Sequence, residues 1–282
     1  MARDENESSI VSHSLVRLWL RRHWREIVLL APAFAGAVVL AWHGPIPQDP
    51  RYDLFADTRT MLGIPNAANV LSNLAFLLAG AAGLLFLSTD RSSTAFRESR
   101  ERLPYFFFFA GVCLTAFGSA WYHLAPDHAR LAWDRLPMTV AFLSLFAAFL
   151  AERVRPDLAR RLLAPFLLAG IASVLYWRFT EQAGRGDLRP YALVQYYPVL
   201  ALGLLLVLYP ARFTLGGVLW GVGGFYALAK AFELADEKIL RSIGFVSGHT
   251  LKHLAAAAAA SLVLFMLARR RPIEEDPSSE VP

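Results

Sequence analysis

Hydrophobic residues along this chain fall into long blocks, separated by short segments that carry most of the charges. A helix needs roughly 20 apolar residues to cross the hydrocarbon core of a membrane. Eight blocks approach that length, at about residues 27–43, 69–88, 104–122, 136–151, 162–177, 191–209, 216–235 and 248–268. The pattern predicts an all-α polytopic membrane protein.

The two ends of the chain are predicted to be soluble tails, over residues 1–26 and 269–282, and disorder is expected for the polar sequence "MARDENESSIVSHS" and for the C-terminal tail. The first apolar block, 27–43, follows basic residues, as the core of a signal peptide does. However, 26 residues lead into it, and the sequence "VVLAWHG" lacks the small-residue pattern of a cleavage site. We therefore expect block 27–43 to be a retained transmembrane helix.

Composition supports a membrane protein and indicates its orientation. Hydrophobic residues make up 56% of the chain and charged residues 18%, with a mean hydropathy of +0.40. Seventeen basic residues fall in the two termini and alternate loops, against nine in the other loops. The positive-inside rule then places both termini in the cytoplasm. This distribution also accounts for the net charge of +5 without nucleic acid, for which no binding motif is present.

Two further features of composition narrow the setting. The single cysteine, Cys113, excludes an internal disulfide and a metal site built from several thiolates. Abundant arginine and alanine with few lysines are typical of bacteria of high genomic GC content, so we expect the protein in a bacterial inner membrane.

Three apolar blocks contain or adjoin polar residues, which are costly at membrane depth and usually functional. Their sequences are "TAFGSAWYHLAPDHARLAWDRLPM", "FYALAKAFELADEK" and "SGHTLKHL". His249 and His253 are four residues apart, so they share one face of a helix. His123 ends another helix on the same, non-cytoplasmic side. Three imidazoles that leave a fourth position open for water are the ligands of a catalytic zinc ion.

Two more polar residues flank this predicted zinc site. Ser119 precedes His123 by one helical turn, and Pro126 breaks the helix just beyond it. Asp134 then stands two residues before Leu136, which opens the next apolar block. We expect Ser119 and Asp134 to lie beside the open position of the metal.

The remaining polar residues within blocks have structural interpretations. Lys230 and Glu233 are three residues apart and are expected to pair with each other. Lys252 lies off the face of the two histidines and is expected to extend toward the membrane surface. Earlier in the chain, Asp187, Arg189 and Gln195 are predicted to line the entrance of a pocket.

With these residues identified, the chain resembles the alkaline ceramidase family, within the superfamily of seven-helix membrane hydrolases that includes adiponectin-receptor-like proteins. The family carries Ser-x-x-x-His, an Asp eleven residues after that His, and His-x-x-x-His at the start of its last helix. A first core helix like "NAANVLSNLAFL" adds to the likeness. The matching positions are Ser119, His123, Asp134, His249, His253, Asn69, Ser72 and Asn73.

The resemblance covers about residues 50–268 and implies a seven-helix bundle, so block 27–43 becomes an extra N-terminal transmembrane helix. It also implies a zinc-dependent amidase that cleaves the N-acyl bond of ceramide or a ceramide-like lipid, giving a fatty acid and a long-chain base. His123, His249 and His253 would hold Zn²⁺. Asp134 would act as general base and Ser119 would stabilise the oxyanion.

One position departs from the family. Eukaryotic relatives bind calcium through an acidic cluster that includes a glutamate three residues before the position of Asn69, and Asn66 stands there in this chain. Asp49, Asp53 and Asp57 do not reproduce the spacing of the cluster, so the resemblance does not extend to Ca²⁺.

Two alternatives remain open at the level of sequence. The same zinc chemistry can hydrolyse another membrane lipid, such as an N-acylated amino lipid or an ester. A receptor-like or ion-conducting protein can also use such a metal for structure alone. The presence of Ser119 and Asp134 beside the histidines favours catalysis, because a structural zinc needs no open position.

Overall fold

The computed structural model describes the backbone of residues 2–274 and the side chains of residues 18–274. Most of this part of the chain is helical. Within this part the only extended pairings are two isolated bridges, Met61–Ile64 and Phe213–Pro272. The helices are α1 (Ala2–His43), η1 (Pro50–Asp53), α2 (Ala67–Leu71), α3 (Leu74–Leu87), η2 (Asp90–Ala95), η3 (Ser99–Glu101), α4 (Arg102–Leu124), α5 (His128–Arg153), α6 (Asp157–Gln182), α7 (Arg189–Leu208), α8 (Val218–Leu234), α9 (Asp236–Ile243) and α10 (Gly248–Arg269).

The prediction of an all-α membrane protein is confirmed. Within the described residues, seven helical segments are long and apolar enough to cross a membrane. Helices α8 and α9 form an eighth when counted together, although they meet at an angle of 78°. One span lies in a first structural unit that ends at His43, and the others belong to a second unit that begins at Gly44.

Helix α1 differs from its prediction. The polar start of the tail, residues 1–14, was expected to be disordered, but the backbone forms one helix that runs unbroken from Ala2 to His43. The apolar part covers Leu18–His43. Low hydropathy led to the expectation of disorder, whereas arginine, glutamate and leucine, which are frequent here, all favour helix.

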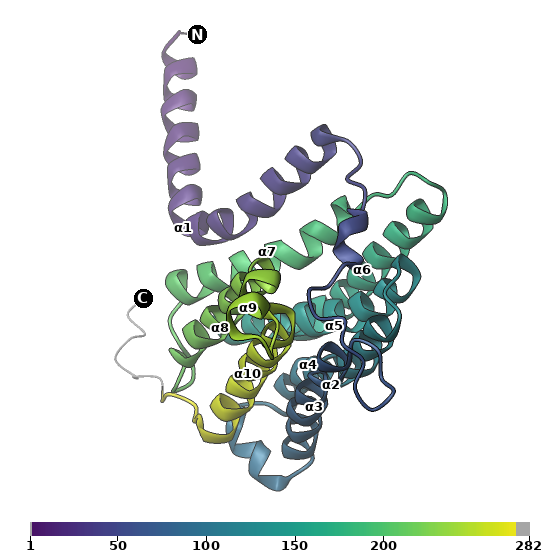
Figure 1. Cartoon of the computed structure of the whole chain (residues 1–282). Helices are drawn as coiled ribbons and strands as arrows, with labels where there is room; N and C mark the ends of the chain where they lie inside the picture. Colours follow the sequence, from purple (N-terminus) through teal and green to yellow (C-terminus); the bar gives the residue numbers. More distant parts are fainter. Residues whose placement is uncertain (1, 275–282) are drawn as a thin grey trace. The chain divides into compact units, whose positions relative to one another are not determined.

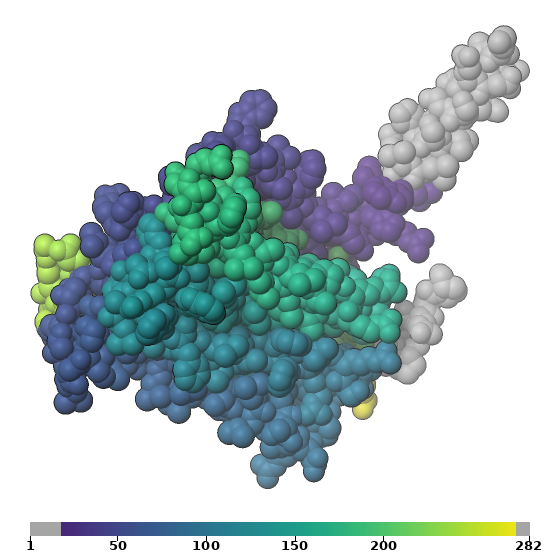
Figure 2. Space-filling view, turned by 90° about the vertical axis from the view of Figure 1, so that its right-hand side faces the viewer, coloured from purple at the N-terminus to yellow at the C-terminus, as the bar shows by residue number. Residues whose placement is uncertain are grey.

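In the second unit, α5 is the central helix. It packs against α4, α6 and α7, and its residues 143–151 are all buried. Figure 2 shows teal and green side chains of α5, α6 and α7 packed together over one face. Helix α10 lies between α8 and α3, as Figure 1 shows. Segments that are far apart in sequence, α3 and α10, are thereby brought into contact.

The functional residues gather at one end of the second unit. Helix α4 ends there at Leu124, and α5 begins only four residues later, because Pro126 interrupts the helix and Asp127 caps the next one. The Asp127 carboxylate accepts a hydrogen bond of 2.7 Å from the backbone N–H of Arg130. The segment 44–66 joins this end, where the Leu188 N–H donates to the Ile46 carbonyl at 2.8 Å.

The opposite end is fixed by buried charge. Arg270, just after α10, is fully buried and donates to the Glu152 carboxylate, which also accepts a hydrogen bond from the Tyr105 hydroxyl. The predicted disordered tail, 269–282, therefore has its second residue, Arg270, held in place. Its last part, residues 275–282, lies outside the described residues.

Candidate metal centre

The three predicted histidines converge. His123 lies in the last turn of α4, and His249 and His253 lie in the first two turns of α10. All three are buried, and one ring nitrogen from each lies within 4.8 Å of the others. This group of side chains can hold a metal ion, as the spacing of the histidines in the sequence indicates.

The spacing of one pair of nitrogens fits a tetrahedral ion. The Nε2 atoms of His123 and His249 are 3.3 Å apart. Two ligands about 2.0–2.1 Å from zinc, at the tetrahedral angle, are separated by about 3.3 Å. Three imidazoles without a carboxylate or thiolate among them form a neutral donor set, which suits zinc and leaves a fourth position open.

A hydrogen bond on the far side of His253 fixes which of its nitrogens can bind the metal. The Ser72 Oγ lies 2.7 Å from the Nδ1 of His253 and donates its own proton to the Asn69 carbonyl at 3.0 Å. Ser72 must therefore accept a hydrogen from His253 Nδ1. In the neutral ring this leaves the Nε2 lone pair free for a metal, in the arrangement typical of metal-binding histidines.

The start of α10 is held by residues outside the helix. The Asp236 carboxylate accepts hydrogen bonds from the backbone N–H groups of His249, at 2.7 Å, and Ala56, at 3.0 Å. A Cβ on Gly248 would lie 2.1 Å from the Phe232 carbonyl oxygen, so glycine is needed for this close approach to α8. These contacts set the position of the histidine pair.

His123 is positioned through its backbone and its ring faces. The Asn66 side-chain amide donates to the His123 carbonyl at 2.8 Å. The ring of Phe55 packs edge-on against His123 and His249, with centroid distances of 4.7 and 4.5 Å. Within the described residues, the Nδ1 of His123 is buried without a hydrogen-bond partner. Phe55 carried no signal in the sequence, because it lies in a loop without a motif.

Ser119 and Asp134 line the cavity beside the histidines. Ser119 lies one turn before His123 on α4. Asp134 lies in the second turn of α5, and not before the helix as expected, because α5 begins at His128. A Cβ on Gly118 would lie 2.1 Å from the Trp133 carbonyl oxygen. Glycine thus lets α4 and α5 approach closely enough to bring the serine and the aspartate together.

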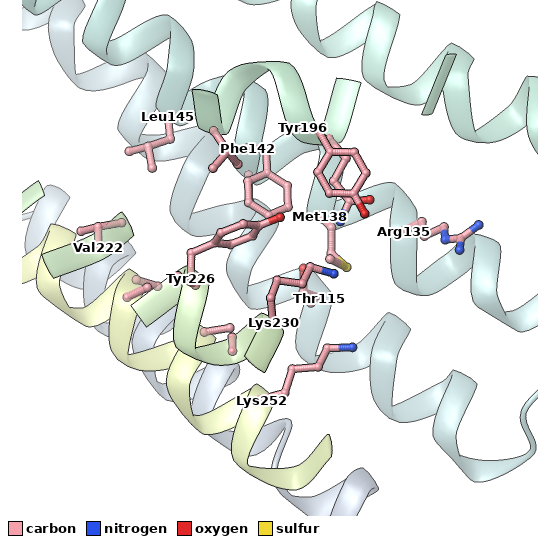
Figure 3. A pocket seen from close by; sticks show the side chains of 18 of the residues that line it. Thr115, Arg135, Met138, Phe142, Leu145, Tyr196, Val222, Tyr226, Lys230 and Lys252 are labelled. Atoms are coloured by element: carbon pink, nitrogen blue, oxygen red, sulfur yellow. The ribbon is translucent and has the colours of Figure 1, made fainter. Parts of the chain in front are cut away.

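The cavity has a volume of about 850 Å³ and runs between α4, α5, α7, α8 and α10. Most of its wall is apolar, formed by side chains such as Phe108, Phe142, Leu145 and Leu206. Figure 3 shows aromatic and aliphatic side chains around this space, with the amines of Lys230 and Lys252 extending into it. Its size falls in the range of small-molecule sites, about 300–1,000 Å³.

The two lysines differ from their predictions. Lys230 pairs with Glu233 at 2.7 Å, as expected, but Lys252 is half-buried and binds the other oxygen of the same carboxylate at 2.6 Å. Lys252 therefore does not extend toward the membrane surface. Its partner lies on another helix, 19 residues away, so the pairing could not be inferred from helical spacing.

The predicted pocket entrance is present in part. Gln195 lines the cavity, whereas Asp187 and Arg189 form an ion pair of 2.8 Å and do not line it. Leu188, between them, does.

The acidic residues of segment 44–66 are bound by neighbours. Asp49 pairs with Arg51, and Asp57 pairs with Arg59 at 2.6 Å. The Arg59 guanidinium holds the pKa of Asp57 below its usual value. Asp53 accepts a hydrogen bond of 2.7 Å from the Tyr122 hydroxyl. Each of the three carboxylates thus has a neighbouring side chain as its partner.

Comparison with models of known protein families gives no match for this chain, and comparison with curated proteins gives none either.

Proposed function

We propose that the chain is a zinc-dependent intramembrane amidase, which hydrolyses the N-acyl bond of a ceramide-like lipid to a fatty acid and a long-chain base. The observation that carries this proposal is the convergence of three buried histidines, of which His253 lines an apolar cavity together with Ser119 and Asp134. The resemblance of these same positions to the alkaline ceramidase family supports it.

The donor set supports zinc as the metal. Three imidazoles suit zinc, which when bound would supply a polarised carbonyl group and an activated water molecule. His123, His249 and His253 would hold the ion. The hydrogen bond from His253 to Ser72 keeps that ring in the required tautomer.

The other residues of the site have separate roles. Asp134 takes the proton of the attacking water and passes it to the nitrogen of the leaving amine. Ser119 donates a hydrogen bond to the oxygen of the former carbonyl group as negative charge develops on it. The apolar cavity holds the hydrocarbon part of the lipid, so that its amide lies beside these groups, and it excludes bulk water from them.

The test combines metal analysis with lipid turnover. Purified wild-type protein is expected to contain about one equivalent of zinc and to release fatty acid from a fluorescent ceramide, and EDTA should abolish the release. Asp134→Asn should retain the zinc and lose activity by about 100-fold or more, the typical contribution of general acid–base catalysis. Asp90→Asn, a change of the same chemistry at an exposed position, should leave both unchanged.

Three results would contradict the proposal. Unchanged turnover in Asp134→Asn would remove Asp134 from the mechanism, and loss of zinc in that variant would assign it to metal binding. A wild-type protein that holds zinc but hydrolyses no amide lipid would favour the structural alternative.

A further inference from the structure

The cavity wall carries a surplus of positive charge close to the metal centre. Lys230 of α8 and Lys252 of α10 both line the cavity, and both bind the single carboxylate of Glu233. The chain has only three lysines, so two of the three are in this one place. One of the two charges is balanced by Glu233, and the other is not.

Each lysine also retains hydrogen-bonding capacity. An ammonium group has three donors, and each of the two lysines donates one hydrogen bond to Glu233. Figure 3 shows the two side chains extending from their helices into the same space. Because Lys252 and His253 line the same cavity, an anion bound to these amines would share that cavity with the amide.

A third cation lines the same cavity. Arg135 is only 5% exposed and follows Asp134 on α5. Its guanidinium donates to the neutral Gln48 amide at 2.7 Å and lies over the rings of Trp177 and Tyr191. Within the described residues it has no carboxylate at ion-pair distance, and its Nη1 has no hydrogen-bond partner.

Nearby carboxylates do not remove this surplus. Among the described residues that line the cavity, the acids are Asp49, which is paired with Arg51, and Asp134; Asp236 lies close to His249 but does not line the cavity. Asp134 and Glu233 together balance two of the three cationic side chains. A divalent ion at the histidines adds further positive charge. Unbalanced charge away from water is costly, so this site favours a ligand that brings a negative charge.

We infer that the amide lipid hydrolysed here carries an anionic group, a carboxylate or a phosphate, on its polar part, and that Lys230 and Lys252 bind this group. The inference rests on the proposed function and narrows its substrate class. A neutral ceramide would fill the cavity but would leave the surplus charge unbalanced.

Two matched pairs of substrates test the inference. N-palmitoylglycine and N-palmitoylethanolamine share their acyl chain and amide, and the first has a carboxylate where the second has a hydroxymethyl group. Ceramide 1-phosphate and ceramide differ by the phosphate. For the wild-type protein, we expect kcat/KM to be at least about tenfold higher for the anionic member of one pair, the gain typical of a charged hydrogen bond. The pair that shows the preference identifies the anion.

The role of Lys230 in binding the anion is tested by Lys230→Gln. This change leaves Glu233 paired with Lys252, so it creates no unpaired buried carboxylate. The ratio of anionic to neutral kcat/KM should fall by about tenfold, and Lys230→Arg, which keeps the charge, should restore most of it. The matched control, Lys238→Gln, changes the exposed third lysine and should keep the wild-type ratio.

The outcomes separate this inference from the proposed function. Hydrolysis of the neutral and anionic members at equal rates would overturn the inference and leave the amidase intact. A preference that Lys230→Gln does not alter would overturn the role of the two lysines. Hydrolysis of none of the four lipids by zinc-loaded protein would overturn the proposed function itself.

Discussion

Replacing Ser72 by alanine removes a single hydroxyl that lies outside the metal centre and should weaken metal binding. The hydroxyl lies 2.7 Å from His253 Nδ1 and orients that ring toward the other two histidines. Without it, the N–H of a buried imidazole loses its partner, and the ring can turn or change tautomer. Loss of such a contact typically reduces metal affinity by about 10–100-fold, which corresponds to about 1.4–2.7 kcal/mol.

The assay is a zinc titration of the purified protein in detergent, in competition with a chelator of known affinity. Ser261→Ala is the control. Ser261 lies on α10, the helix that carries His253, and its hydroxyl donates to the Ala257 carbonyl one turn away. Its zinc affinity should equal that of the wild type. If Ser72→Ala binds zinc within twofold of the wild type, the reasoning about ring orientation and tautomer is wrong.

Two further predictions concern stability, measured as thermal unfolding in detergent. Gly118→Ala should lower the midpoint, because the new Cβ would press on the Trp133 carbonyl at a cost of about 1–3 kcal/mol. Gly223→Ala, with open space around its Cβ, should leave the midpoint unchanged. Equal midpoints for the two variants would contradict the close approach of α4 and α5. The Arg189 guanidinium lowers the pKa of Asp187 from 3.8 to about 2. The stability this pair provides is complete above the unfolded value and is lost as pH falls toward 2, so Asp187→Asn should flatten the pH dependence in that window, and an unchanged slope would refute the assignment.

Sequence alone predicted the metal centre well, because its ligands follow helical geometry. His249 and His253 share a face at any i, i+4 spacing, and Pro126 fixes where the helix of His123 ends. Both facts are local. The convergence of the two helices was inferred from their orientation in the membrane, and the structure confirms it.

The misplaced residues depend on contacts between helices or on weak boundaries. Asp134 was expected outside its helix, because the charges of residues 127–135 look unlike a span although they form the first turns of α5. Lys252 was assigned to the membrane surface because its partner, Glu233, lies on a helix whose approach no local pattern reveals. The cavity itself is likewise a product of packing among five helices.

The metal ligands come from segments 126 residues apart, and the second segment is the last helix of the chain. During synthesis a growing polypeptide that has not yet inserted α10 holds one of the three imidazoles and cannot form the centre. Binding of an ion by all three imidazoles therefore requires that α4 and α10 are both in place. A chain cut short before Gly248 keeps most of its membrane segments but lacks two of the three imidazoles.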